Sequence, residues 1–159
     1  MPEVHVRPSW DEYFMKIMEA VASRATCDRA RSGAVIVRDK RIISTGYVGA
    51  PRGLPHCDEV GHLFKRSIKP DGTETQNCIR TTHAEMNAIV QAALHGVSLK
   101  DATLYCRMEP CIDCAKAIIS AGIKRVVCQM RYKDSEITRD FFRQAGIELV
   151  ALNDAVAKY

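Results

Sequence analysis

The sequence contains no apolar run of about 18 residues, so a membrane-spanning helix is not expected. Its first residues, Met1 to Trp10, lack the apolar core of a secretory signal, which favours a cytoplasmic protein. Aromatic residues make up only 6% of the chain and no cluster of Lys and Arg stands out, so a surface that stacks nucleic-acid bases is not expected. The net charge of +4 suits an anionic small molecule but is too small to indicate nucleic acid.

The chain has 7 cysteines, an odd number that fits a disulfide framework poorly. In a reducing compartment, thiols serve as metal ligands or as small buried side chains. Cys106 and Cys128 fall within predicted strands and are interpreted as buried core residues. The remaining cysteines are therefore the candidates for metal binding.

Apolar periodicity predicts one α/β domain over residues 1–159. Helices are predicted at residues 10–24, 83–96, 111–121 and 136–145, the first opened by a capping box at Ser9 and Glu12. Strands are predicted at residues 33–37, 41–47, 102–106, 124–130 and 147–152. The first two strands form a hairpin, whereas helices separate the last three, which are therefore parallel. The predicted fold is a three-layer α/β/α sandwich with a mixed five-stranded sheet, a hairpin plus three parallel strands.

Residues 48–82 interrupt this pattern. Proline and glycine recur through the segment and break any long element, so it is predicted to be an irregular insertion. A loop of this length inside a compact domain usually carries function or is tied down by other groups.

Two short motifs carry the strongest chemical signal. His83-Ala-Glu85 and Pro110-Cys111-Ile-Asp-Cys114 each begin a predicted helix, and together they offer one imidazole and two thiolates. Three protein ligands leave the fourth position of tetrahedral zinc for water, whose pKa zinc lowers toward neutrality. Glu85 can then move protons between that water and a substrate. This arrangement is the signature of the zinc deaminases.

A structural zinc site or a redox pair is the alternative interpretation of Cys-x-x-Cys. Neither has any need of Glu85, so the combination of motifs favours catalysis. A non-catalytic zinc-binding regulatory protein that kept the fold remains an alternative.

Further motifs along the chain are shared with one family. They are Thr26-Cys27, Gly33-Ala-Val-Ile-Val37, Thr45-Gly46-Tyr47, Gly49-Ala50-Pro51, Gly53, His56-Cys57, Cys78-Ile-Arg-Thr, His83-Ala-Glu-Met-Asn-Ala-Ile89, Pro110-Cys-Ile-Asp-Cys114 and Ala121-Gly-Ile-Lys124. On these motifs the sequence resembles the zinc-dependent cytidine and deoxycytidylate deaminase superfamily, and within it the deoxycytidylate (dCMP) deaminases. The long insertion and the short Cys-x-x-Cys spacing favour this group over the tRNA adenosine deaminases and the riboflavin-pathway deaminases.

The resemblance implies hydrolysis of dCMP to dUMP and ammonia, which feeds dTMP synthesis. Zinc-bound water would attack C4 with Glu85 as the proton shuttle. Many members are hexamers that dCTP with Mg²⁺ activates and dTTP inhibits, so a homo-oligomer with these effectors is expected. The alternatives are deamination of another cytosine nucleotide such as dCTP, or of a base in nucleic acid.

The resemblance also implies a second, structural zinc in the insertion. Its ligands would be Cys27, Cys57, Cys78 and His62, with His56 as a rival for the histidine position. Such a site would fix a loop that has few apolar residues of its own. The alternative is a set of free thiols.

Substrate contacts are expected from several positions. The backbone at Ala84 and the aromatic ring of Tyr132 correspond to substrate contacts in the family, but Val48 stands where many members have asparagine and offers no donor or acceptor. A planar guanidinium suits phosphate oxygens, and the candidates for this role are Arg29, Arg31 and Arg52.

Overall fold

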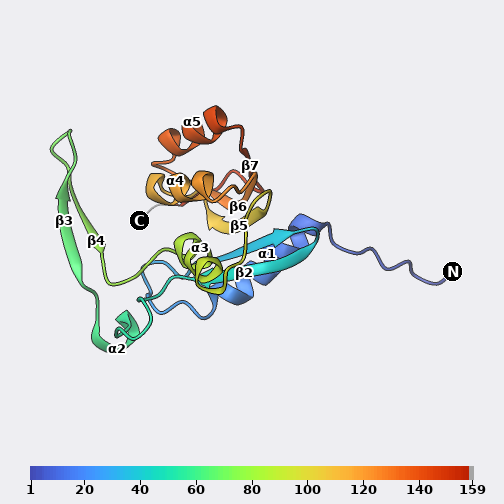
Figure 1. Ribbon diagram of the computed structural model, residues 1–159, viewed down its shortest axis with the longest axis horizontal. Coiled ribbons are helices and arrows are strands. Elements are labelled where there is room, and N and C mark those ends of the chain that lie inside the picture. Colours follow the sequence, from blue (N-terminus) through green and yellow to red (C-terminus); the bar gives the residue numbers. More distant parts are fainter. Residues whose placement is uncertain (158–159) are drawn as a thin grey trace.

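The computed structural model describes residues 1–157, so positions 158–159 of the predicted domain lie outside the described residues (Figure 1). Its helices are α1 (Trp10–Ala22), α2 (Cys57–Val60), α3 (Ala84–His95), α4 (Ile112–Ser120) and α5 (Glu136–Ala145). Its strands are β1 (Gly33–Arg38), β2 (Arg41–Tyr47), β3 (Phe64–Ile68), β4 (Glu74–Cys78), β5 (Thr103–Met108), β6 (Arg125–Tyr132), β7 (Glu148–Ala151) and β8 (Val156–Ala157). Among these residues, none of the helices has both the length and the apolar character needed to cross a membrane.

The predicted mixed sheet is confirmed, with the strand order β2-β1-β5-β6-β7. Strand β1 is antiparallel to β2 and β5, while β5, β6 and β7 are parallel. The hairpin turns at Asp39 and Lys40, whose φ values of 52° and 62° correspond to a type I′ turn. The prediction missed β8, which pairs with β6 as a sixth strand, because two residues are too few to show an alternating pattern.

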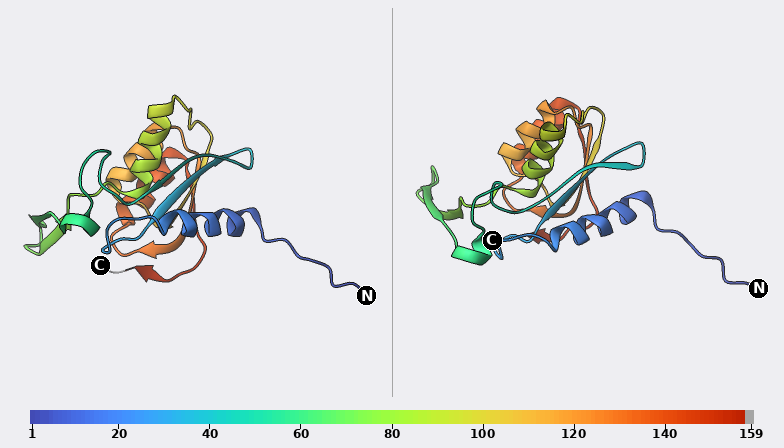
Figure 2. Two further views of the ribbon diagram at one scale, coloured as in Figure 1. Left: turned by 90° about the horizontal axis from the view of Figure 1, so that it is seen from below. Right: turned by 60° about the horizontal axis from the view of Figure 1, so that its bottom comes forward.

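Helices cover both faces of the sheet, as predicted (Figure 2). Helix α1 packs on one face, where its Phe14 and Met18 are buried with sheet residues Val35, Val37, Tyr105 and Val127. Helices α3, α4 and α5 cover the other face, and its sheet residues include Ile36, Leu104, Cys106, Val126 and Cys128. Successive strand residues point to opposite faces, and the middle residues of β1, β5 and β6 are buried on both faces of the sheet. Cys106 and Cys128 are fully buried, as their interpretation as core thiols requires.

The insertion is more ordered than the sequence indicates. It contains α2 and the β3–β4 hairpin, which stands away from the main sheet (Figure 1). Most hairpin side chains are exposed, so the segment lacks the alternation of apolar and polar residues by which strands are predicted. The prediction of a wholly irregular insertion is therefore wrong.

Two bidentate ion pairs connect helices to the sheet. On one face, Arg125 of β6 donates from both terminal nitrogens to the carboxylate of Asp11 in α1, at 2.8 Å each. On the other, Arg139 of α5 donates to both oxygens of Glu109, which follows β5, at 2.7 Å each. The Glu109 side chain is 0% exposed, whereas that of Asp11 is 26% exposed. Both pairs are bidentate, through Nη1 and Nη2 of Arg125 and through Nε and Nη2 of Arg139, but they differ in their access to water.

Replacing Arg139 with methionine should destabilise the protein more than replacing Arg125 with methionine. Arg139→Met leaves a fully buried carboxylate without its main partner and should lower the free energy of unfolding by about 3 kcal/mol. Arg125→Met leaves a carboxylate that water can reach, so the loss should be about 1 kcal/mol. Urea unfolding of both variants measures the difference, and equal losses would contradict the assigned burial.

The Asp11 pair should also make stability depend on pH. The hydrogen bond from Arg125 lowers the pKa of Asp11 below its usual value, even though partial burial opposes the shift. A carboxylate whose pKa is lower in the folded state stabilises it above the unfolded pKa of about 3.9, and this stabilisation is lost as the pH falls through the folded pKa. Asp11→Asn should therefore be less stable than wild type at pH 7 and approach it near pH 3. The melting temperatures of wild type and Asp11→Asn are compared at pH 7 and pH 3. The same difference at both pH values would refute the role of the Asp11 charge.

Candidate metal centre and active-site pocket

The first predicted ligand set comes together at the starts of two helices. His83 is the N-cap residue of α3 and Cys111 the N-cap residue of α4, while Cys114 lies in the first turn of α4. The Nδ1 atom of His83 is 3.4 Å from Sγ of Cys111 and 3.5 Å from Sγ of Cys114. The structure thus brings together the three side chains that the sequence motifs single out.

Close contact between α3 and β2 fixes the position of His83 and Glu85. A Cβ atom on Gly46 would lie only 2.5 Å from the carbonyl oxygen of Ala84 and 2.3 Å from the amide nitrogen of Ala88, so only glycine fits there. Ser44 on the same strand donates a hydrogen bond of 2.6 Å to the carbonyl of Ala88. The first turns of α3 are therefore held directly against the strand.

The segment that carries Cys111 is held by α5. Thr138 donates a hydrogen bond of 2.9 Å to the carbonyl oxygen of Pro110, and the ion pair with Arg139 holds Glu109. Glu109 also accepts a hydrogen bond of 3.0 Å from the backbone N–H of Tyr132. The sequence analysis missed Glu109, Thr138 and Arg139 because their contacts join positions about 30 residues apart that share no short motif.

Glu85 lies beside the ligand cluster in a buried position. Its Oε2 atom is 4.0 Å from Sγ of Cys114, and the residue is 8% exposed. Burial raises the pKa of Glu85 above its usual value. A hydrogen bond with Cys111 raises the pKa of His83 to about 9, and a hydrogen bond with Cys114 lowers the pKa of Cys111 to about 4. The cluster therefore favours a thiolate, the form of cysteine that binds metals.

The spacing of these donor atoms fits zinc. Tetrahedral zinc, with bonds of about 2.0–2.3 Å, places its ligand atoms about 3.3–3.8 Å apart. The distances from Nδ1 of His83 to the two sulfur atoms, 3.4 Å and 3.5 Å, fall within this range. Two sulfurs and one imidazole nitrogen, with a carboxylate nearby, also match the donor types of catalytic zinc sites.

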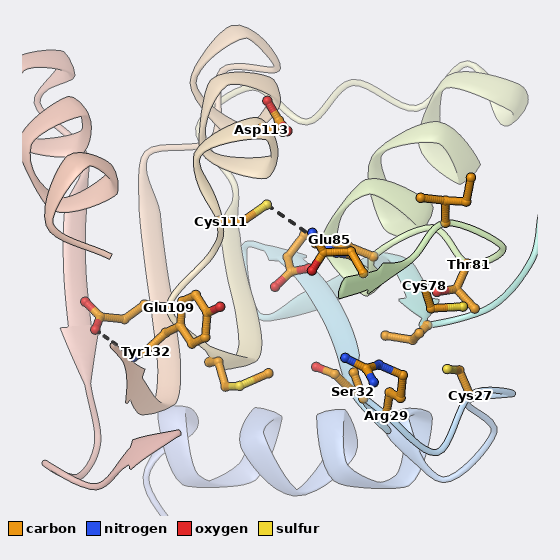
Figure 3. Close-up of a pocket in the computed structure, with 16 residues that line it drawn as sticks. Cys27, Arg29, Ser32, Cys78, Thr81, Glu85, Glu109, Cys111, Asp113 and Tyr132 are labelled. Carbon is orange, nitrogen blue, oxygen red and sulfur yellow. Dashed lines mark hydrogen bonds between the residues drawn. The ribbon is translucent and has the colours of Figure 1, made fainter. Parts of the chain in front are cut away.

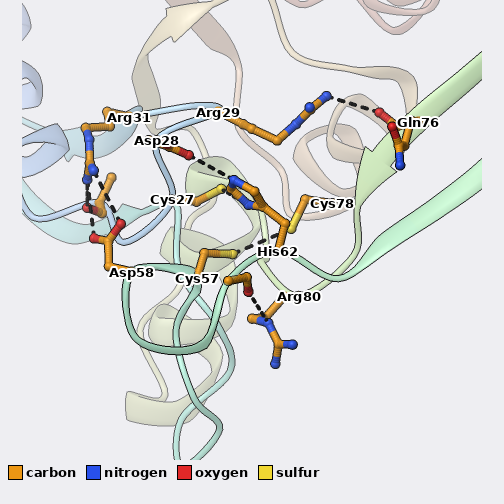
Figure 4. Close-up of polar contacts among 12 residues, drawn as sticks. Cys27, Asp28, Arg29, Arg31, Cys57, Asp58, His62, Gln76, Cys78 and Arg80 are labelled. Atoms are coloured by element: carbon orange, nitrogen blue, oxygen red, sulfur yellow. Dashed lines mark hydrogen bonds and ion pairs between the residues drawn. The ribbon is translucent and has the colours of Figure 1, made fainter.

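The second predicted ligand set also comes together, at the base of the insertion (Figure 4). Sγ of Cys27 is 3.6 Å from Nδ1 of His62, and Sγ of Cys57 is 3.5 Å from Sγ of Cys78. Asp28 lies 3.0 Å from the other ring nitrogen of His62. A carboxylate in this position orients a histidine whose opposite nitrogen binds metal. These four side chains have the spacing and the donor types of a structural zinc site.

His56, the rival for the histidine position, has a different role in the structure. Its Nδ1 atom is 2.9 Å from the hydroxyl of Thr26 and accepts a hydrogen bond of 3.3 Å from the N–H of Ala50. His56 therefore connects two loops and lies outside the cluster that contains His62.

A cavity of about 610 Å³ joins the two clusters (Figure 3). His83, Glu85 and Cys111 line it on one side, and Cys27 and Cys78 on another. The predicted substrate residues Arg29, Val48 and Tyr132 also line this cavity, whereas Arg31 and Arg52 are not among the described residues that do. Arg31 instead forms an ion pair of 3.3 Å with Asp58. Ser32, Asn77 and Thr81 are further lining residues that the sequence analysis did not single out.

The model of the cytidine and deoxycytidylate deaminase zinc-binding region matches residues 8–130. The chain is 42% identical over 152 residues to ComE operon protein 2 of Bacillus subtilis, covering 94% of this chain and 76% of that protein. It is 40% identical over 143 residues to the deoxycytidylate deaminase of Schizosaccharomyces pombe, covering 90% of this chain but only 44% of that longer protein. The crystal structure of dCMP deaminase from the cyanophage S-TIM5, in complex with dCMP and dUMP, is 30% identical with a TM-score of 0.73, covering 93% of this chain and 100% of that one. The chain therefore belongs to the cytidine and deoxycytidylate deaminase family.

Proposed function

We propose that this protein hydrolyses dCMP to dUMP and ammonia. The observation that carries the proposal is the buried Glu85 carboxylate, which lies beside a His-Cys-Cys cluster on the wall of a cavity. The proposal is further supported by the relatives that are named deoxycytidylate deaminase, and by the phage relative whose structure contains dCMP and dUMP.

We assign His83, Cys111 and Cys114 as the ligands of the catalytic zinc. The chemistry that zinc supplies when bound is a water molecule acidic enough to react near neutral pH. The N-terminal end of α4 favours the thiolate of Cys111, because the backbone N–H of Cys114 forms a hydrogen bond with it.

Glu85 acts as the general acid and base. Its carboxylate accepts the two protons of the attacking water one after the other, and delivers the first to N3 of the ring and the second to the amino group that leaves as ammonia. Burial raises the pKa of this carboxyl group, which makes it a better proton acceptor than an exposed glutamate. The carboxylate lies 4.0 Å from Sγ of Cys114, close to the proposed zinc site, but it is not one of the three proposed ligands.

The remaining cavity residues bind the nucleotide. The backbone of Ala84 faces the pyrimidine edge, Tyr132 contacts the base or sugar, and Arg29 binds the phosphate. Arg29 is exposed, lines the cavity and donates a hydrogen bond of 3.1 Å to the carbonyl of Gln76, which orients its guanidinium. Val48 is buried in the same wall and supplies no polar contact.

The resemblance to deoxycytidylate deaminases supports the rest of the proposal. The product dUMP feeds dTMP synthesis, dCTP with Mg²⁺ activates the enzyme, and dTTP inhibits it. The protein is a homo-oligomer, with a hexamer as the expected form, built from one deaminase domain over residues 1–159.

We assign the second cluster to a structural zinc. Cys27, Cys57, His62 and Cys78 supply the four ligands, and Asp28 orients His62. Backbone hydrogen bonds from Leu63 and Arg80 lower the pKa of Cys78 to about 6, although burial opposes this. The cluster joins the loop before β1 to both ends of the insertion.

Ammonia release from the purified zinc-loaded protein tests the proposed reaction, with dCMP, CMP, dCTP, deoxycytidine and a tRNA anticodon loop as substrates. dCMP should be the best substrate, and its turnover should rise with dCTP and Mg²⁺ and fall with dTTP. Glu85→Gln should retain zinc but lose about 10²- to 10⁴-fold in turnover. The control is Asp113→Asn, another carboxylate that lines the cavity, which should retain most of the wild-type rate. No release from any free nucleotide would refute the proposed substrate.

The second zinc is tested by a matched pair of histidine variants. His62→Asn removes an imidazole from the cluster, so the zinc content should fall from two to about one per chain and the melting temperature should drop. His56→Asn keeps a hydrogen-bond acceptor for Thr26 and Ala50 and should retain both ions. Metal analysis after dialysis gives the result, and full zinc content in His62→Asn would exclude His62 as a ligand.

A further inference from the structure

Ser32 and Val48 form a neighbouring polar and apolar pair on the wall of the cavity. Ser32 directly precedes β1 and Val48 directly follows β2, and the N–H of Val48 donates a hydrogen bond of 3.0 Å to the carbonyl of Ser32. This contact extends the strand pairing beyond Gly33 and Tyr47. Both residues line the same cavity as Glu85, so a ligand there meets both side chains.

The hydroxyl of Ser32 is available for such a ligand. The residue is only 5% exposed, and among residues 1–157 no hydrogen-bond partner is found for its hydroxyl. A hydroxyl that lines a cavity and has no partner in the protein can form a hydrogen bond with a ligand there. By contrast, the buried hydroxyl of Ser44 donates to the carbonyl of Ala88 at 2.6 Å. Ser32 thus presents a hydrogen-bonding group that the protein itself does not use.

The location of Ser32 indicates which part of the substrate it meets. Figure 3 shows Ser32 next to Arg29 on the same wall, with Glu85 on the α3 side of the cavity. In the proposed function Glu85 faces the base and Arg29 the phosphate, and the sugar of a nucleotide lies between these two groups. Ser32 lies beside Arg29 on this wall, next to the place of the phosphate, so we expect its side chain to face the adjacent sugar.

We propose that Ser32 is a specificity-determining residue whose hydroxyl hydrogen-bonds the 3′-hydroxyl of the deoxyribose. This inference rests on the proposed function. Ser32 supplies the polar contact that the adjacent Val48 cannot make, because valine has neither donor nor acceptor. Val48 instead packs against the apolar part of the sugar.

The contact is tested by measuring kcat/KM of wild type and Ser32 variants on two substrates. These are dCMP and 2′,3′-dideoxycytidine monophosphate, which lacks the 3′-hydroxyl. Wild type should prefer dCMP in kcat/KM by about tenfold, as expected for one hydrogen bond. Ser32→Ala should lose about tenfold on dCMP and almost nothing on the dideoxy substrate, so the preference should disappear. The Ser32→Ala/Val48→Asn variant should regain it, since asparagine at the neighbouring position restores a polar group. Ser44→Ala, the control for loss of a buried hydroxyl, should be less stable but keep the wild-type preference.

The outcomes separate the two proposals. A wild-type protein that does not deaminate dCMP would overturn both the proposed function and the role of Ser32. An active wild type whose Ser32→Ala variant keeps the preference, or loses the same factor on both substrates, would overturn only the role of Ser32.

Discussion

The site depends on the direct contact between α3 and β2. Gly46 has no side chain, and the helix occupies the space that a Cβ atom would need, against the backbone of Ala84 and Ala88. Alanines at buried positions of the helix let it approach this closely, and Ser44 fixes it by a hydrogen bond. Because His83 and Glu85 lie at the start of this helix, the contact also sets their distance from Cys111 and Cys114. A larger residue at position 46 would therefore displace His83 and Glu85 as well as the helix.

Regular elements of the sheet could be predicted from the sequence because local pattern and tertiary environment agree. The capping box at Ser9 and Glu12 and the hairpin of β1 and β2 are found where the sequence predicts them. The first ligand cluster could be predicted because a zinc site restricts residue types and their spacing, and the second because the sequence resembles a family in which these positions bind a structural zinc. The β3–β4 hairpin could not, since its exposed side chains leave no apolar pattern, and neither could the Glu109–Arg139 pair, which only the folded chain brings together.

The second cluster also shapes the cavity. Cys27 and Cys78 both line the cavity. Arg29 and Ser32, which follow Cys27 in the chain, and Thr81, which follows Cys78, line it as well. Joining Cys27 to Cys78 through one cluster therefore fixes the two segments that form the wall opposite His83 and Glu85. The insertion also contacts α3, because the side chain of Asn87 donates hydrogen bonds to the carbonyl oxygens of Gly49 and Thr82.

Two buried glutamates near Cys111 illustrate how the environment assigns their roles. Glu85 has no cationic side chain within hydrogen-bonding distance among the described residues, and burial raises its pKa. Burial also acts on Glu109 and is the largest single effect, but the hydrogen bonds from Arg139 and from the backbone of Tyr132, with the positive charges of Arg139 and Arg131, together lower the pKa of this carboxyl group. A carboxylate that is permanently charged and paired suits a structural role, whereas one with a raised pKa can gain and lose a proton during a reaction. Glu109 thus holds the segment that carries Cys111, whereas Glu85 can gain and lose a proton.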